Sequence, residues 1–205
     1  MTVAMDTGLN VSRETLTALE SYAALLEKWN ARINLVAPST IPDLWQRHIL
    51  DSSQLFDLAP VDSRLWVDLG SGGGLPGIVC AILAKEKKPL CRFTLIESDK
   101  RKAAFLMTAA RELSLEVEVI AKRVEQVPAL GADVVSARAL APMPQLLPLV
   151  ARHLAETGVA LLPKGKSHAE ELAAARLEWQ FEATSHDSKT NASARILTLK
   201  GLKRG

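Results

Sequence analysis

The segment Val67-Asp68-Leu69-Gly70-Ser71-Gly72-Gly73-Gly74-Leu75-Pro76-Gly77 decides the fold of this chain. The apolar run at residues 65–69 predicts a strand and residues 77–85 predict a helix, so the glycines lie at a turn from strand to helix. Rossmann-type folds bind nucleotide-like cofactors at this turn, because glycines let the backbone bend tightly and approach a ligand. The glycines expected to line such a site are Gly70, Gly72 and Gly74.

Asp68 indicates which cofactor the turn binds. Gly72, Gly74 and Gly77 satisfy the pattern Gly-x-Gly-x-x-Gly, so a dinucleotide such as NAD has to be considered. A carboxylate two residues before the first glycine would repel a pyrophosphate, whereas S-adenosylmethionine has no phosphate and carries an ammonium and a sulfonium. Starting at Asp68, the string Asp-x-Gly-x-Gly-x-Gly is the first motif of methyltransferases with this fold. S-adenosylmethionine is therefore the predicted cofactor, and Asp68 one of its ligands.

Two later segments supply the other expected cofactor ligands. Glu97 ends a predicted strand at residues 93–97, where its carboxylate can accept hydrogen bonds from both ribose hydroxyls or can cap the next helix. Val124 follows a third predicted strand at residues 117–121 and is expected to pack on the adenine ring. Glu125 is expected either to accept from the adenine amino group or to cap a short helix.

Strands and helices alternate after residue 63, which predicts a doubly wound, mostly parallel α/β sheet. The predicted strands are residues 65–69, 93–97, 117–121, 133–137 and 159–162, and the predicted helices are residues 77–85, 100–113, 124–127, about 144–155 and 168–177. Two late strands, residues 180–184 and 195–199, have no helix between them. They predict an antiparallel C-terminal pair.

Residues 1–62 predict a helical extension in front of the cofactor-binding domain. Ser12 can cap an amphipathic helix that reaches about residue 32. A second helix is expected over residues 40–56, where His48 and Asp51 lie on one face. The predicted division is thus an N-terminal helical extension at 1–62 and a methyltransferase domain at 63–205.

The two regions differ in charge. Residues 1–62 hold four basic and eight acidic side chains, whereas residues 63–205 hold 21 basic and 15 acidic ones. The cluster Lys100-Arg101-Lys102 begins a helix, where positive charge is mildly unfavourable to the helix dipole. RNA phosphate is the expected reason for this cluster and for Lys164-Gly165-Lys166, although solvated lysines explain any one cluster as well.

The composition excludes several classes of protein. Hydrophobic residues make up 48% of the chain and charged residues 23%, which is typical of a globular protein. The longest apolar run, residues 78–84, is shorter than the ~20 residues of a membrane helix, and Asp6 lies where a signal peptide would be basic. Cys80 and Cys91 are expected to be small core residues, and the four histidines are scattered. We expect a cytoplasmic protein with no membrane partner and no metal.

Over nearly its whole length the chain resembles the glucose-inhibited division protein B family, which methylates N7 of a guanine in 16S ribosomal RNA. The matching residues are Asn34-Leu35, residues 47–52 (Arg-His-Ile-Leu-Asp-Ser), Asp68, residues 70–77, Lys100-Arg101, residues 123–125, residues 136–139 and Lys164-Gly165. The resemblance implies a Rossmann-like class I methyltransferase sheet, and 16S ribosomal RNA or the small-subunit particle as substrate. The cofactor contacts that it implies are Gly70, Leu75, Val124, Glu125 and Arg138.

Residues 136–139 follow the fourth predicted strand and bear on the atom that is methylated. Enzymes that methylate exocyclic amines carry an Asn/Asp-Pro-Pro-aromatic motif at this position, and this chain has Ser-Ala-Arg-Ala. Methylation of pyrimidine C5 needs a cysteine nucleophile nearby, and neither cysteine is at this edge. Guanine N7 attacks with its own lone pair and needs no general base, so positioning suffices.

Arg138 is the predicted catalytic residue, bonded to the cofactor carboxylate or to guanine O6; the alternative is a surface salt bridge. The residues expected to contact RNA are Lys100, Arg101, Lys164 and His48. His48 and Asp51 are explained equally well by holding the N-terminal helices on the sheet. A small-molecule methyltransferase and a non-enzymatic RNA-binding or division factor remain as rival functions.

Overall fold

The computed structural model describes residues 8–205, so Asp6 lies outside the described part. Its strands are β1 (Leu65–Leu69), β2 (Arg92–Ile96), β3 (Val117–Ile120), β4 (Ala132–Ala137), β5 (Leu154–Lys164), β6 (Trp179–Asp187) and β7 (Arg195–Arg204). They form one seven-stranded sheet in the order β3-β2-β1-β4-β5-β7-β6. β1 to β5 pair in parallel, and β7 pairs antiparallel with both β5 and β6. The predicted fold class is confirmed, including the antiparallel C-terminal pair.

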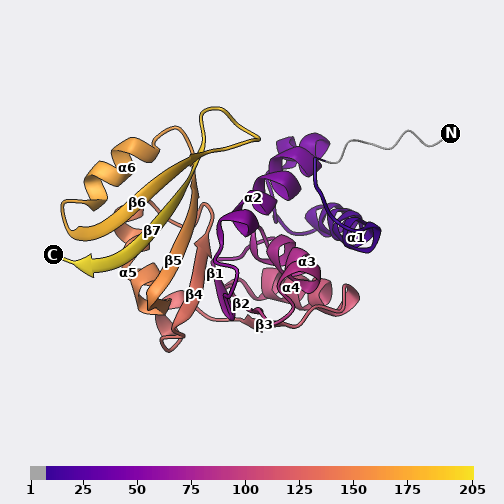
Figure 1. Cartoon of the computed structure of the whole chain (residues 1–205). Helices are drawn as coiled ribbons and strands as arrows, with labels where there is room; N and C mark the ends of the chain where they lie inside the picture. Colours follow the sequence, from indigo (N-terminus) through magenta and orange to yellow (C-terminus); the bar gives the residue numbers. More distant parts are fainter. Residues whose placement is uncertain (1–7) are drawn as a thin grey trace.

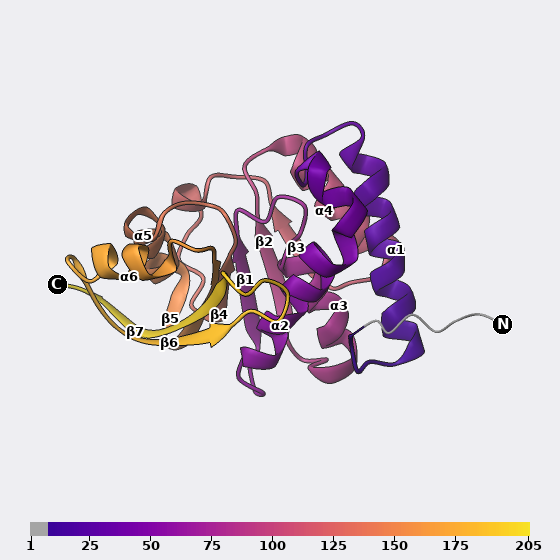
Figure 2. The same ribbon diagram turned by 90° about the horizontal axis from the view of Figure 1, so that it is seen from above.

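Helices cover both faces of this sheet (Figures 1 and 2). They are α1 (Arg13–Asn30), η1 (Pro38–Asp43), η2 (Trp45–Leu50), α2 (Asp51–Leu58), α3 (Gly77–Lys87), α4 (Lys100–Glu112), η3 (Val124–Gln126), α5 (Met143–His153) and α6 (His168–Ala175). α1 to α4 lie on one side, and α5 and α6 on the other. β1 is buried on both faces, with Trp66 in the first hydrophobic cluster and Val67 in the second. No described helix is long and apolar enough to cross a membrane.

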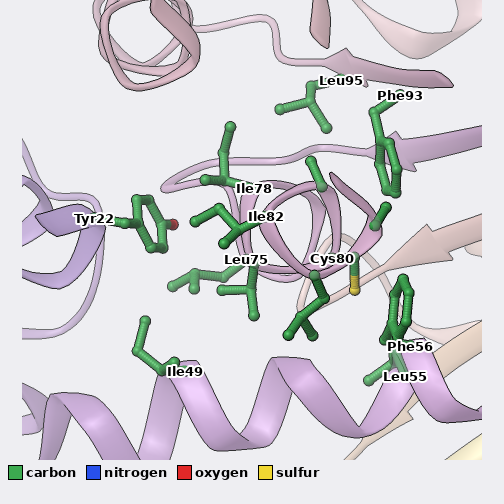
Figure 3. Packing of buried hydrophobic residues seen from close by; sticks show 14 of the residues in the cluster. Tyr22, Ile49, Leu55, Phe56, Leu75, Ile78, Cys80, Ile82, Phe93 and Leu95 are labelled. Carbon is green, nitrogen blue, oxygen red and sulfur yellow. The ribbon is translucent and has the colours of Figure 1, made fainter. Parts of the chain in front are cut away.

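The N-terminal helices share the hydrophobic core of the α3 and α4 side. Ser12 caps α1 as predicted, since its Oγ accepts from the Thr15 amide at 3.2 Å. The ring of Phe105 in α4 lies 6.5 Å from that of Tyr22 and 5.6 Å from that of Trp29. Figure 3 shows Ile49 and Phe56 packed in the same cluster as α3. The division of the chain at residue 62 stays a prediction.

The prediction of a single helix over residues 40–56 is wrong. The chain instead forms the 3₁₀ turn η1, the π-helical turn η2 and the α-helix α2. Pro42, inside η1, has no backbone N–H to continue a helical ladder. π-turns are uncommon and occur often at functional sites. Here η2 carries His48, and α2 begins at Asp51.

The two cysteines differ in burial. Cys80 is fully buried in α3, as predicted. Cys91, in the turn before β2, is only partly buried and packs against the edge of the first hydrophobic cluster, so the prediction of a core residue is confirmed in part. The turn that contains it also carries the exposed Leu90, which shows that this stretch lies at the surface.

Candidate functional site

The glycine-rich turn connects β1 to α3 and has a backbone that requires glycine. Gly70, Gly72 and Gly74 have φ values of +63°, +54° and +81°, in the left-handed region that side chains disfavour. A Cβ built on Gly77 would lie 2.4 Å from Leu95 Cδ2 of β2. The turn predicted from the sequence is therefore present, packed closely against the neighbouring strand.

Asp68 lies beneath this turn and is only 1% exposed. Ser136 Oγ donates to Asp68 Oδ1 at 2.6 Å, and the Gly77 amide donates to Oδ2 at 3.3 Å. Burial raises the pKa of Asp68 to about 6, against the opposing effect of these hydrogen bonds. Asp68 thus supports the turn from below, and its direct contact with the cofactor stays a prediction.

Tyr22 holds the turn from the other side, and the sequence did not predict this role. Its hydroxyl donates to the Gly73 carbonyl oxygen, and Figure 3 shows the ring of Tyr22 reaching from α1 toward the start of α3. The side chain is fully buried, and this burial raises the pKa of Tyr22 far above its usual value. A tyrosine on the apolar face of α1 was the available signal. It gave no indication of the partner.

A cavity of about 280 Å³ opens beside the turn, and we call it the cofactor groove. Four predicted cofactor residues line it: Gly70, Glu97, Val124 and Glu125. Leu75 lies in the first hydrophobic cluster and is 5% exposed. Its contact with a cofactor stays a prediction. Gly72 and Gly74 shape the turn, but they are not among the residues that line the cofactor groove.

Glu97 is fixed at the rim of the cofactor groove by two backbone amides. Its Oε2 accepts from the Gly72 N–H at 2.8 Å, and its Oε1 accepts from the Asp99 N–H at 2.7 Å. Each carboxylate oxygen can accept a second hydrogen bond. The carboxylate is therefore oriented in advance, with acceptor capacity left for hydroxyl groups.

A second and larger cavity, of about 1200 Å³, lies on the other side of the loop that follows β4, and we call it the large pocket. Arg138, His48, Asp51 and Lys164 line it. The loop residues that line both cavities are Ala139 and Leu140. Ala139 has a φ of +53°, an unfavourable value for alanine that turns the chain directly after Arg138. The site thus consists of two cavities separated by one loop.

Arg138 is clamped by two side chains of the N-terminal segment. Its Nη1 lies 3.4 Å from Asp51 Oδ2, and its Nη2 lies 3.2 Å from His48 Nδ1. The side chains of Arg138 and Asp51 are 20% and 21% exposed. Arg138 is therefore in a salt bridge, as the alternative expected, and this salt bridge is half-buried and joins distant elements. The catalytic role of Arg138 stays a prediction. The expectation that His48 and Asp51 hold the N-terminal helices on the sheet agrees with this geometry.

The hydrogen bonds of His48 define its tautomer. Thr40 Oγ1 donates its one proton to the Ala37 carbonyl oxygen at 2.7 Å, so it accepts from His48 Nε2, which lies 2.7 Å away. Nε2 therefore carries the hydrogen, and Nδ1 has a lone pair for Arg138. Burial, followed by the nearby Arg138 charge, lowers the pKa of His48 to about 4. Contact of His48 with RNA stays a prediction, while its hold on Arg138 is present in the structure.

Lys164 braces the loop between the two cavities. Its Nζ lies 2.8 Å from Glu171 Oε2 and 3.2 Å from the Ala141 carbonyl oxygen. Glu171 Oε2 also accepts from the Met143 amide at 3.0 Å. The Lys164 side chain is only 10% exposed, so its ammonium is engaged within the protein. A contact with RNA phosphate stays a prediction.

Lys100 and Arg101 are exposed at the start of α4. Asp99 caps this helix, since its Oδ1 accepts from the Arg101 amide at 2.8 Å. The cap supplies the negative charge that a helix N-terminus favours. The next residue, Lys102, lines the cofactor groove, so the basic cluster continues to the rim of the site.

Residues 15–198 match the family described as GidB, rRNA small subunit methyltransferase G. The ribosomal RNA small subunit methyltransferase G of Cereibacter sphaeroides is 58% identical over 194 residues, which cover 95% of this chain and 93% of the relative. The protein of the same name from Paramagnetospirillum magneticum is 51% identical over 195 residues, covering 95% and 93%.

Two solved structures have a similar fold. The TYW2 protein of M. jannaschii, solved in complex with AdoMet, has a TM-score of 0.56 at 17% identity and covers 85% of this chain and 80% of its own. A TehB-like SAM-dependent methyltransferase from Corynebacterium glutamicum has a TM-score of 0.56 at 14% identity, covering 91% and 99%. At these identities the likeness concerns the fold alone.

Proposed function

Because the chain belongs to the GidB family of rRNA small subunit methyltransferase G proteins, we propose that it methylates N7 of a guanine in 16S ribosomal RNA. The chain is a methyltransferase that uses S-adenosylmethionine. The observation that carries the proposal is the pair of cavities on either side of the loop after β4. One cavity holds four of the predicted cofactor residues, and the other holds Arg138 in a fixed orientation.

The residues of the cofactor groove fit S-adenosylmethionine. Glu97 presents a fixed carboxylate with free acceptor capacity, as ribose hydroxyls require. Val124 supplies an apolar wall for the adenine ring, and Glu125 an acceptor for its amino group. When bound, the cofactor supplies an electrophilic methyl group on its sulfonium. The fixed backbone of Gly70 lies at the edge of the same groove.

The large pocket suits an acceptor that loses no proton. His48, the imidazole beside Arg138, uses both ring nitrogens in hydrogen bonds. The Asp51 carboxylate pairs with Arg138, and the Glu171 carboxylate pairs with Lys164. These side chains serve to hold Arg138 and its loop. Guanine N7 attacks as a neutral lone pair, so orientation by Arg138 is the main contribution required from the protein.

Two measurements test this proposal. Calorimetry should detect binding of S-adenosylmethionine and none of NAD, and Glu97→Ala should weaken binding about tenfold, because it removes one hydrogen-bonding carboxylate. Glu112→Ala, an exposed position at the end of α4, is the matched control. With S-adenosylmethionine labelled in its methyl group, the label should be transferred to small-subunit ribosomal RNA. Transfer to free guanosine at an equal rate would instead indicate a small-molecule enzyme.

A further inference from the structure

We infer that the hydroxyl group of Thr190, in the loop between β6 and β7, positions the guanidinium of Arg138 through Asp51. The inference rests on the proposed function, because it takes Arg138 as a group that contacts cofactor or substrate. Thr190 belongs to residues 188–194, which we call the hairpin tip. In both ribbon views this loop extends from the C-terminal strands toward α2 (Figures 1 and 2).

The connection from Thr190 to Arg138 uses both oxygens of one carboxylate. Thr190 Oγ1 donates to Asp51 Oδ1 at 2.7 Å. The other oxygen, Oδ2, lies 3.4 Å from Arg138 Nη1. A carboxylate that accepts on both sides cannot rotate without breaking one of these two hydrogen bonds. The hairpin tip therefore fixes the plane of Asp51, and Asp51 fixes one side of the guanidinium.

Thr190 Oγ1 directs its proton to the charged Asp51 carboxylate at 2.7 Å. Ser188 Oγ lies 3.0 Å from Thr190 Oγ1, where either hydroxyl can be the donor, and in this arrangement it donates to Thr190. Gln54 Nε2 lies 3.4 Å from Thr190 Oγ1 and can only donate to it. Gln54 Oε1 accepts from the Lys189 amide at 2.6 Å, which anchors the backbone of the hairpin tip to α2. Gln54 is itself buried, with 6% of its surface exposed. The tip is thus docked by a buried glutamine, and the Thr190 hydroxyl is oriented toward the carboxylate.

The position of the hairpin tip gives this contact a functional meaning. Residues of the tip, among them Thr190 and Asn191, form one wall of the large pocket. Arg138 has a long and flexible side chain, and its hold on a ligand depends on the direction of its planar fork. His48 fixes one end of the fork and Asp51 the other. Removal of the Thr190 hydroxyl should free Asp51 and widen the orientations that Arg138 samples.

The test compares Thr190→Val, which keeps the shape of the side chain and removes the hydroxyl, with Thr190→Ser, which keeps the hydroxyl. We expect Thr190→Val to lower kcat for RNA methylation about tenfold with little change in KM, since misplacement by about 1 Å can cost up to about 100-fold. Thr190→Ser should stay within about twofold of the wild type. Thr184→Val, the same substitution at an exposed position in β6, is the matched control.

A second readout follows Arg138 directly. In protein with ¹⁵N-labelled arginine, the Arg138 side-chain signal is assigned by its disappearance in Arg138→Lys. Thr190→Val should broaden or shift this signal, and Thr190→Ser should not. If circular dichroism shows that Thr190→Val does not fold, Thr190→Ala is used in place of Thr190→Val, because it removes the same hydroxyl.

Two results would separate the possible failures. Wild-type kcat together with an unchanged Arg138 signal in Thr190→Val overturns the positioning role. Absence of RNA methylation by the wild-type protein overturns the proposed function, while the Arg138 signal still decides whether Thr190 orients the guanidinium.

Discussion

Arg138 leaves the end of β4 with its guanidinium between His48 Nδ1 at 3.2 Å and Asp51 Oδ2 at 3.4 Å. Both partners come from the N-terminal segment, about ninety residues earlier in the chain. A guanidinium presents five N–H donors in a rigid plane, so two held donors leave others for a ligand in a defined direction. The orientation of this one side chain is therefore set by the packing of η2 and α2 on the sheet.

Arg138→Lys should impair methyl transfer severely, although the charge is kept. An ammonium cannot make the planar two-sided contact, and a hydrogen bond to a charged group contributes about 1.5–3 kcal/mol. We expect the single-turnover rate to fall roughly 10- to 100-fold, as this free energy implies. Arg111→Lys, at an exposed position in the last turn of α4, should match the wild type. Wild-type rate and cofactor affinity in Arg138→Ala would show that the site is misplaced.

Asp68 should make the stability of the protein depend on pH in an unusual direction. Its folded pKa of about 6 exceeds the ordinary value of about 3.9 expected in the unfolded chain. Between about pH 4 and 6 the folded protein thus binds more protons than the unfolded chain at this group. The contribution of Asp68 to the free energy of unfolding is present below pH 4 and falls as pH rises through 6.

Asp68→Asn removes this titration. Urea unfolding across pH 4 to 7 should show that the difference in stability between variant and wild type grows with pH in favour of the variant, by on the order of 2–3 kcal/mol. The other titrating groups are common to both proteins, so the difference isolates Asp68. A difference that stays constant over this range would mean that the carboxyl titrates normally.

At the scale of elements, the apolar runs predicted most of the sheet. β1 occupies the predicted residues 65–69. β2 is shifted by one residue at both ends, and β3 ends one residue before its predicted end. β5 begins at Leu154, five residues before its predicted start. Its early part includes the exposed polar residues Glu156 and Thr157 and pairs with β4 through an irregular register, which the pattern of side chains does not encode.

The helical breaks around His48 were not predictable from side-chain spacing. An α-helix and a π-turn place similar residues on similar faces, and the difference lies in which carbonyl each amide reaches. In this chain His48 contacts Thr40 of η1 and also Arg138, which is 90 residues away in sequence. Side-chain spacing within residues 40–56 does not encode the second of these contacts.

Some residues of the candidate site could likewise be predicted from the sequence, and others could not. Glu97, Val124 and Glu125 could be predicted, because parallel strands bring their carboxyl ends to one edge of the sheet. Tyr22 and Thr190 could not, because their partners Gly73 and Asp51 are 51 and 139 residues away in sequence. Only the packing of α1 and of the C-terminal hairpin on the core brings these residues together.

Mutations of Lys164, which contacts the loop after β4, and of Lys100 and Arg101, at the start of α4, should affect different properties of the enzyme. Replacing Lys100 and Arg101 together with alanine should reduce the dependence of RNA affinity on salt, by about one unit of slope for each phosphate that is no longer neutralised. Lys164→Met should lower kcat, because it releases the Ala141 carbonyl and Glu171 from their contacts with Lys164. A lowered slope in Lys164→Met would support the predicted contact of Lys164 with RNA phosphate, and an unchanged slope would contradict it.

At the scale of the whole molecule, the two cavities lie on opposite sides of one loop. The cofactor groove lies beside β1, β2 and β3, and the large pocket lies between the N-terminal segment and the C-terminal hairpin. Both cavities share Ala139 and Leu140, so a methyl donor on one side and an acceptor on the other would meet at this loop. Under the proposed function, the N-terminal segment and the C-terminal hairpin would form the side that receives the substrate.

The most direct test is to map methylated nucleotides in 16S ribosomal RNA from a strain that lacks this gene. The account predicts that mass spectrometry finds one guanosine without its N7 methyl group, and that the wild-type gene restores it while the Arg138→Ala gene does not. Purified protein with S-adenosylmethionine should methylate the same N7 atom in RNA or particles from the deletion strain. An unchanged set of methylated guanosines, or restoration of a methyl group at another atom, would contradict the account.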